Sequence, residues 1–124
     1  MIIGCTGNYR KEEFYAILQK VYSILKDENV EFLISSDLEK NTEFEIPNEY
    51  IIMEFSQLVE KCDVLFAIGG DGTILSTVRR LGKYMKPIMG IHIGGLGFLS
   101  ECTEKNLKES INSILKNEYF ISQR

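Results

Sequence analysis

A glycine-rich stretch with a carboxylate at its centre is the part of the sequence that most suggests chemistry. Residues 67–80 read AIGGDGTILSTVRR, in which glycines surround Asp71 between an apolar run and a helical pattern. Glycines at such a junction let backbone N–H groups approach an anion, and the start of a helix favours negative charge. A carboxylate there would repel phosphate unless it accepts the proton of an attacking hydroxyl or binds Mg²⁺. The stretch therefore favours phosphoryl transfer.

A purely structural interpretation of the same residues stays open. Asp71 can instead be the N-terminal capping carboxylate of the following helix, and Thr73 can either offer its hydroxyl to phosphate or cap that helix. The spacing matches neither the GxxxxGK-Ser/Thr phosphate loop nor the GxGxxG dinucleotide fingerprint. Arg79 and Arg80 fall in the middle of the predicted helix, where a solvated face is a simpler interpretation than phosphate contact.

A second glycine-rich stretch, GGLGFLS at residues 94–100, follows another apolar run. Its apolar side chains, Leu96 and Phe98, can close over a planar base or can pack into the core. His92 is the only histidine and lies near the end of the preceding strand. We expect it to be a structural histidine rather than an acid, base or ligand.

Strand-like and helix-like segments alternate along the chain. Residues 37–48 are predicted to form a loop, and residues 50–61 suit either a short strand or a short helix. The remaining predicted elements are strands at 1–6, 30–35, 63–68, 88–93 and 119–121, and helices at 12–26, 72–84 and from about residue 103 onward.

Two of these helices carry specific expectations. In the helix at 72–84, the apolar face is predicted to consist of Ile74, Leu75, Val78 and Leu81. In the last helix, the predicted N-cap is Thr103. The predicted buried stripe of that last helix is Leu107, Ile111, Ile114 and Leu115.

This order of elements predicts an α/β fold: a three-layer, doubly wound, mostly parallel sheet of the Rossmann-like kind, with helices on both faces. Both glycine-rich stretches follow predicted strands. Because ligands bind outside the carboxyl ends of the strands in such sheets, the two stretches are expected at one edge of the sheet.

Composition narrows the class of protein. A length of 124 residues predicts a single domain, and a net charge of −4 argues against a nucleic-acid surface. No apolar run is long enough for a transmembrane helix, and the N-terminus lacks the basic start of a signal peptide. Cys5, Cys62 and Cys102 have no metal-ligand or redox-motif spacing, so we expect reduced thiols in a cytoplasmic protein.

The two stretches together resemble the NAD kinases. GGDGT at residues 69–73 is shared with a wider superfamily that includes lipid kinases, whereas GIHIGGLGFLS at residues 90–100 is more specific. The resemblance implies transfer of the ATP γ-phosphate to the adenosine ribose 2′-hydroxyl of NAD, which gives NADP. It assigns Asp71 as proton acceptor. It places Gly70, Gly72 and Thr73 along the nucleotide phosphates and Leu96 and Phe98 near the adenosine of NAD.

The resemblance also carries expectations about the whole protein. It implies a divalent metal, expected to be Mg²⁺, ATP or polyphosphate as donor, NAD or NADH as acceptor, and homo-oligomers in complete members. Residues 1–124 look like the N-terminal domain of such an enzyme, without the family's all-β second domain. His92 stands where many members carry Asn. Alternatives are the equivalent domain of a lipid kinase and a non-enzymatic nucleotide-binding domain. On its own, the chain is expected to fold but to lack NAD kinase activity.

Overall fold

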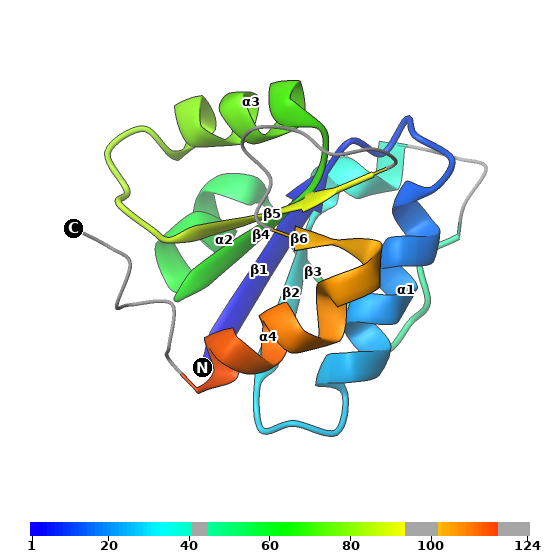
Figure 1. The fold of residues 1–124 in the computed structure, drawn as a ribbon. Coiled ribbons are helices and arrows are strands. Elements are labelled where there is room, and N and C mark those ends of the chain that lie inside the picture. The colour runs from blue at the N-terminus through cyan, green and yellow to red at the C-terminus, as the bar shows by residue number, and fades with distance from the viewer. Residues whose placement is uncertain (41–44, 94–101, 117–124) are drawn as a thin grey trace.

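The computed structural model describes residues 1–40, 45–93 and 102–116 (Figure 1). Strands and helices alternate along most of the chain, with two short 3₁₀ helices, η1 and η2, among them. In chain order the elements are β1 (Ile2–Gly7), α1 (Phe14–Leu25), β2 (Glu31–Ser35), η1 (Ser36–Lys40), β3 (Ile51–Met53), α2 (Phe55–Lys61), β4 (Val64–Gly69), α3 (Asp71–Leu81), β5 (Ile88–His92), β6 (Cys102–Thr103), η2 (Glu104–Asn106) and α4 (Leu107–Leu115).

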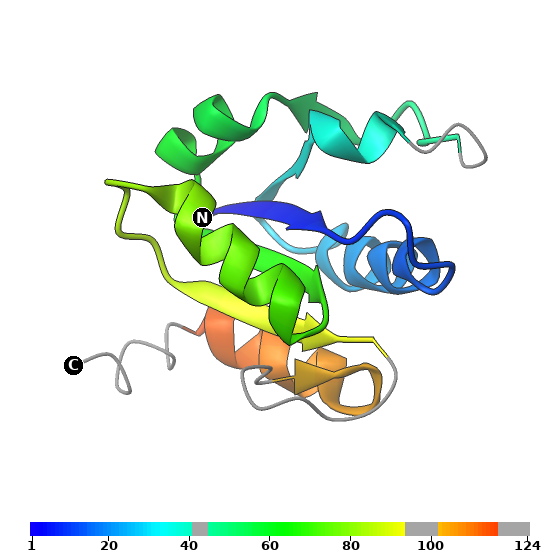
Figure 2. The same cartoon turned by 90° about the horizontal axis from the view of Figure 1, so that it is seen from above.

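The strands form one parallel sheet in the order β3-β2-β1-β4-β5-β6. From β1 the chain moves outward through β2 to β3, returns to β4 beside β1, and then moves outward in the other direction. Helices lie on both faces of this sheet (Figures 1 and 2). The predicted doubly wound, three-layer α/β fold is therefore confirmed. The carboxyl ends of β1 and β4 flank the point where the winding direction changes.

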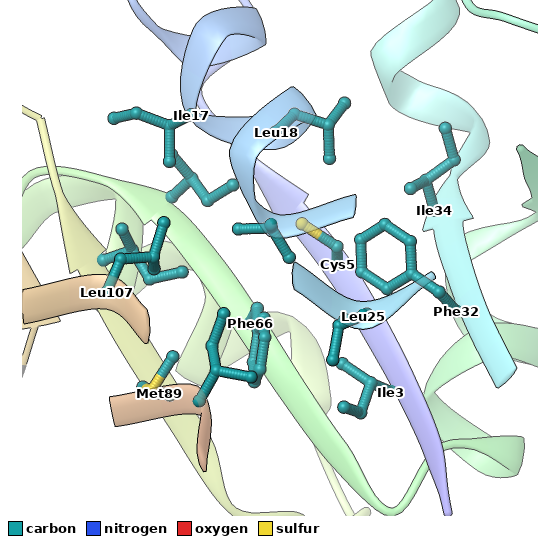
Figure 3. Close-up of a cluster of buried hydrophobic side chains, with 14 of the residues drawn as sticks. Ile3, Cys5, Ile17, Leu18, Leu25, Phe32, Ile34, Phe66, Met89 and Leu107 are labelled. Atoms are coloured by element: carbon teal, nitrogen blue, oxygen red, sulfur yellow. The ribbon is translucent and has the colours of Figure 1, made fainter. Parts of the chain in front are cut away.

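One face of the sheet is covered by α1 and α4. Phe66 and Met89 contribute from central strands, Leu18 from α1 and Ile111 from α4, and all four are buried in one cluster. Figure 3 shows the sheet side of this cluster, with Ile3, Cys5 and Phe66 facing residues of α1. Central strand β4 is buried along its whole length, which explains why its sequence is apolar on both faces.

The opposite face is covered by α2 and α3. Leu58 of α2 and Leu81 of α3 pack on Leu65 of β4 in a second, smaller cluster. Gly4 of β1 makes this packing possible, because a Cβ there would lie 2.4 Å from Cδ2 of Leu58. The two clusters lie on the two sides of a single sheet, as a three-layer fold requires.

The buried face of α3 differs from the prediction. Ile74 and Leu81 are buried as expected, but Leu75 and Val78 are 46% and 50% exposed. Thr77 takes the inward position instead, and its hydroxyl donates to the Thr73 carbonyl at 2.8 Å. That internal bond satisfies the hydroxyl, so a threonine can replace an apolar residue against the sheet.

Other boundaries also differ. The predicted loop at 37–48 begins inside η1, where Leu38 is buried and its carbonyl accepts the Tyr15 hydroxyl at 2.9 Å. The ambiguous segment at 50–61 contains both a strand, β3, and a helix, α2. Thr103 belongs to β6, and the N-cap of α4 is Asn106, so the predicted cap is wrong. The strand predicted at 119–121 lies outside the described residues.

Candidate nucleotide site at the carboxyl edge of the sheet

Three neighbouring strands end together at the edge where the glycine-rich turn begins. Gly7 of β1 is in register with Ile68 of β4, and Gly69 of β4 is in register with His92 of β5. Beyond the strands, the Asn8 N–H donates to the Ile68 carbonyl at 2.9 Å. The Ile93 N–H donates to the Gly69 carbonyl at 3.0 Å. These bonds hold the GGDGT turn between the ends of β1 and β5.

The turn leads directly into α3. Gly70 is the N-cap with an extended backbone (φ −112°, ψ −169°) and has no side chain that could cap the helix, and Asp71 is the first helical residue. Neither Asp71 nor Thr73 is therefore the N-cap residue itself, and Asp71 is an acidic residue in the first turn, where the helix dipole favours negative charge. The first N–H groups of an α-helix have no partner within the helix, and the helix dipole is positive there. The start of α3 can thus accept an anion such as phosphate.

The glycines of the turn have different surroundings. A Cβ at Gly69 would lie 2.5 Å from Oγ1 of Thr73, so the approach of Thr73 to the strand requires glycine at that position. A Cβ at Gly70 or at Gly72 would meet nothing within 4 Å. Packing within the chain therefore accounts for Gly69 but not for Gly70 or Gly72. The space beside these two glycines is where a ligand can approach the backbone most closely.

Asp71 lies beside this open space and is partly exposed, so its carboxylate oxygens are within reach of a bound molecule. Within residues 1–40, 45–93 and 102–116, no group of three or more His, Cys, Asp or Glu could hold a metal ion. Oxygen ligands suit Mg²⁺, which often binds through one or two carboxylates together with substrate phosphates. Asp71 fits that pattern as a single protein ligand.

Arg79 and Arg80, which the sequence analysis considered as possible phosphate contacts, lie in the last turn of α3, away from the GGDGT turn. Arg80 forms an ion pair with Asp37 of η1, and its guanidinium carbon lies 3.8 Å from the centre of the Phe55 ring. Arg80 therefore links α3 to η1 and α2 through these contacts, and its side chain does not point toward the GGDGT turn. Arg79 is exposed in the last turn of the same helix.

The thiols do not belong to the site. Cys5 and Cys62 are free and buried, as expected, and desolvation by burial raises the pKa of each thiol. A raised pKa disfavours the nucleophilic thiolate, so neither cysteine suits covalent catalysis. The side chain of Cys102 lies outside the described residues.

Two predicted site residues, Leu96 and Phe98, also lie outside the described residues. Conversely, the edge includes Asn8, which sequence reasoning did not select. Its side-chain oxygen accepts from the Arg10 N–H at 3.1 Å, and its backbone joins β1 to β4. The available signal was its position just after a strand, the same signal that marked the GGDGT turn.

No helix within the described residues is both long and apolar enough to cross a lipid bilayer. The longest, α1, has 12 residues.

Known proteins that are similar to this chain include NAD kinases from several organisms. The chain is 32% identical over all 124 residues to the NAD kinase of Caldicellulosiruptor saccharolyticus and covers 41% of that protein. It is 34% identical over 122 residues to the NAD kinase of Clostridium tetani and covers 40% of that one. The chain thus spans about two fifths of the length of these relatives.

Solved structures share the fold. The crystal structure of yeast NADH kinase complexed with NADH matches 94% of this chain with a TM-score of 0.78 and 22% identity. The match covers 38% of the yeast chain. An Archaeoglobus fulgidus NAD kinase in complex with ATP matches the same share, with a TM-score of 0.62 and 22% identity. The family model described as ATP-NAD kinase N-terminal domain matches residues 3–119. This chain therefore belongs to the ATP-NAD kinase N-terminal domain family.

Proposed function

We propose that residues 1–124 form a single α/β domain that supplies the N-terminal part of an NAD kinase active site. The reaction is transfer of the ATP γ-phosphate to the adenosine ribose 2′-hydroxyl of NAD, which forms NADP. The observation that carries this proposal is the position of Asp71. It is a partly exposed carboxylate in the first turn of α3, next to glycines that face open space, at the edge where doubly wound sheets bind ligands.

In this proposal the start of α3 binds the phosphates of the donor. The N–H groups near Gly70, Gly72 and Thr73 donate to phosphate oxygens, and the absence of side chains on the two glycines allows the close approach. Mg²⁺ bound to these phosphates would neutralise part of their charge.

The chemical step needs a proton acceptor at the hydroxyl. The 2′-oxygen forms a bond to the γ-phosphorus, the bond from that phosphorus to the bridging oxygen breaks, and ADP leaves. The hydroxyl proton passes to the carboxylate of Asp71. Positioning and charge stabilisation supply most of the rate enhancement in phosphoryl transfer, so Asp71 needs an acceptor held within hydrogen-bond reach.

The proposal also covers how the acceptor NAD is bound and how the complete protein assembles. Leu96 and Phe98 pack near the adenosine of NAD, and the complete protein forms a cytoplasmic homo-oligomer. Among the solved relatives, the yeast protein is complexed with NADH and the archaeal one is in complex with ATP. These complexes support a nucleotide donor and a nicotinamide dinucleotide acceptor.

The direct test replaces Asp71 in a longer protein. Residues 1–124 would take the place of the corresponding region in the NAD kinase of Caldicellulosiruptor saccharolyticus, and NADP formation from NAD, ATP and Mg²⁺ would be measured. Asp71→Asn keeps the shape of the side chain but removes its charge. We expect turnover to fall by about 10²–10⁴-fold, as is typical for loss of a general base.

Asp27→Asn is the matched control, because Asp27 is an exposed carboxylate that follows α1. It should leave turnover unchanged, and both variants should unfold at the temperature of the parent. Turnover of the Asp71 variant within about threefold of the parent would remove Asp71 from the chemical step, because that is far below the loss expected of a general base.

A further inference from the structure

His92 is the last residue of β5 and the only histidine in the chain. Its position is tied to the turn, since it is in register with Gly69 and the next N–H, of Ile93, donates to the Gly69 carbonyl at 3.0 Å. His92 is therefore a direct neighbour of the residue from which the GGDGT turn starts.

The side chain of His92 lies on the face of the sheet that α3 covers. Met89 and Ile91 of β5 point into the core cluster under α1 and α4, and side chains alternate along a strand, so His92 points to the opposite face. Gly69 is paired with His92 in the sheet, so a side chain at Gly69 would point to the same face. A Cβ at Gly69 would lie 2.5 Å from Oγ1 of Thr73, which places Thr73 on that face. The imidazole therefore projects from the same face of the sheet as the Gly69 position that approaches Thr73 of α3.

The two ring nitrogens of His92 have different environments. Nδ1 is enclosed and has no hydrogen-bond partner among the described residues, and this combination is not found for Nε2. The ring as a whole remains partly exposed. A proton on Nδ1 would be an enclosed N–H without an acceptor, which is rare in folded proteins. This arrangement favours the tautomer that carries its proton on Nε2.

We propose that His92 is a nucleotide-binding residue of this site, in which Nε2–H donates a hydrogen bond to a phosphate oxygen of the bound nucleotide. The proposal rests on the proposed function, which puts nucleotide phosphates at the start of α3. Three observations join in it: the register with Gly69, the shared face with Thr73, and the open space beside Gly70 and Gly72. The imidazole adds a side-chain donor to the backbone donors of the helix.

The first experiment reads the tautomer and the contact in the 124-residue chain. Because His92 is the only histidine, ¹⁵N-histidine labelling of protein made without a histidine tag gives one ring to observe by NMR. We expect the Nε2–H tautomer, and a shift of the Nε2 signal when tripolyphosphate or ATP is added. NAD is the third arm and shows whether the contact is with the donor or with the dinucleotide. The Nδ1–H tautomer, or no shift at millimolar concentrations of all three, would overturn the proposal. Adenosine, which has no phosphate, should cause no shift, and an equal shift with it would also overturn the proposal.

The second experiment separates the two ring nitrogens by substitution. Glutamine carries its amide nitrogen at about the distance of Nε2, and asparagine carries it at about the distance of Nδ1. His92→Gln should keep the affinity for tripolyphosphate within about threefold, whereas His92→Asn and His92→Leu should weaken it about tenfold or more, as for a lost hydrogen bond to a charged acceptor. The opposite order, or equal affinities in all three variants, would contradict a contact through Nε2.

Neither readout uses NADP formation, so the two proposals can fail separately. If the ring signal of the 124-residue chain responds to tripolyphosphate but the longer chimera forms no NADP, the His92 contact stands and the kinase proposal fails. NADP formation by the longer protein together with an unresponsive ring would do the reverse.

Discussion

At the scale of single residues, the GGDGT turn contains glycines that are needed for different reasons. Gly69 makes room for Thr73 of the same chain, whereas Gly72 has open space where its side chain would be. None of the three glycines of the turn has a positive φ; within the described residues only Gly82 does. Their value is therefore close approach to neighbours and ligands rather than an unusual backbone conformation.

This difference predicts opposite effects for two alanine substitutions. Gly69→Ala should lower the free energy of unfolding by about 1–3 kcal/mol, because the added methyl group overlaps Thr73. Gly72→Ala lies in a helix with free space around it and should raise the free energy of unfolding by about 0.5–1 kcal/mol. Urea denaturation of the 124-residue chain measures both.

The same Gly72→Ala variant should bind tripolyphosphate more weakly than the parent, because the methyl group enters the space assigned to the phosphates. A more stable chain with unchanged affinity would mean that phosphate does not approach the backbone at Gly72.

At the scale of elements, α3 connects the site to the rest of the fold. Its first turn forms the phosphate-facing end, its Ile74, Thr77 and Leu81 face the sheet, and Arg80 reaches from its last turn to Asp37 and Phe55. The arginine is partly exposed, so its ion pair stabilises the chain by no more than about 1 kcal/mol. Burial of the apolar residues is what sets the rotation of the helix on the sheet.

The two adjacent residues Ile74 and Leu75 test that rotation. Ile74 is 6% exposed, and Ile74→Ala should cost about 2–5 kcal/mol of unfolding free energy through lost burial and a cavity. Leu75 is 46% exposed, and Leu75→Ala should cost less than about 1 kcal/mol. Similar losses for both substitutions, measured by urea denaturation, would show that α3 buries the apolar face predicted from its sequence.

At the scale of the whole molecule, the described residues bring Asp71, a glycine turn and His92 to the carboxyl edge of the sheet. The NAD kinases of Caldicellulosiruptor saccharolyticus and Clostridium tetani are more than twice as long as this chain, which covers 41% and 40% of them, respectively. In the proposed reaction the ribose of the acceptor must be held against Asp71, and such positioning can contribute about 7–11 kcal/mol of barrier lowering.

We therefore expect the purified 124-residue chain to fold cooperatively but to form no NADP from NAD, ATP and Mg²⁺. The longer chimera with the Caldicellulosiruptor saccharolyticus protein, assayed beside it, is the positive control. Circular dichroism and urea denaturation would establish that the short chain is folded. Steady NADP formation by the short chain would mean that residues 1–124 hold the acceptor without further polypeptide.

Side-chain patterns along the chain were enough to predict the order and type of most elements and the location of the GGDGT turn after a buried strand. These features follow from side-chain periodicity within one segment and from the short connections that parallel strands and helices use. Packing in three dimensions decided that Thr77, rather than Leu75 or Val78, faces the sheet. It also decided that Arg80 pairs with Asp37, and that Asn8 and His92 border the turn. Those outcomes depend on which strands pair and on how a helix is rotated against the sheet. Contacts between residues far apart in the chain set both, and no local pattern encodes them.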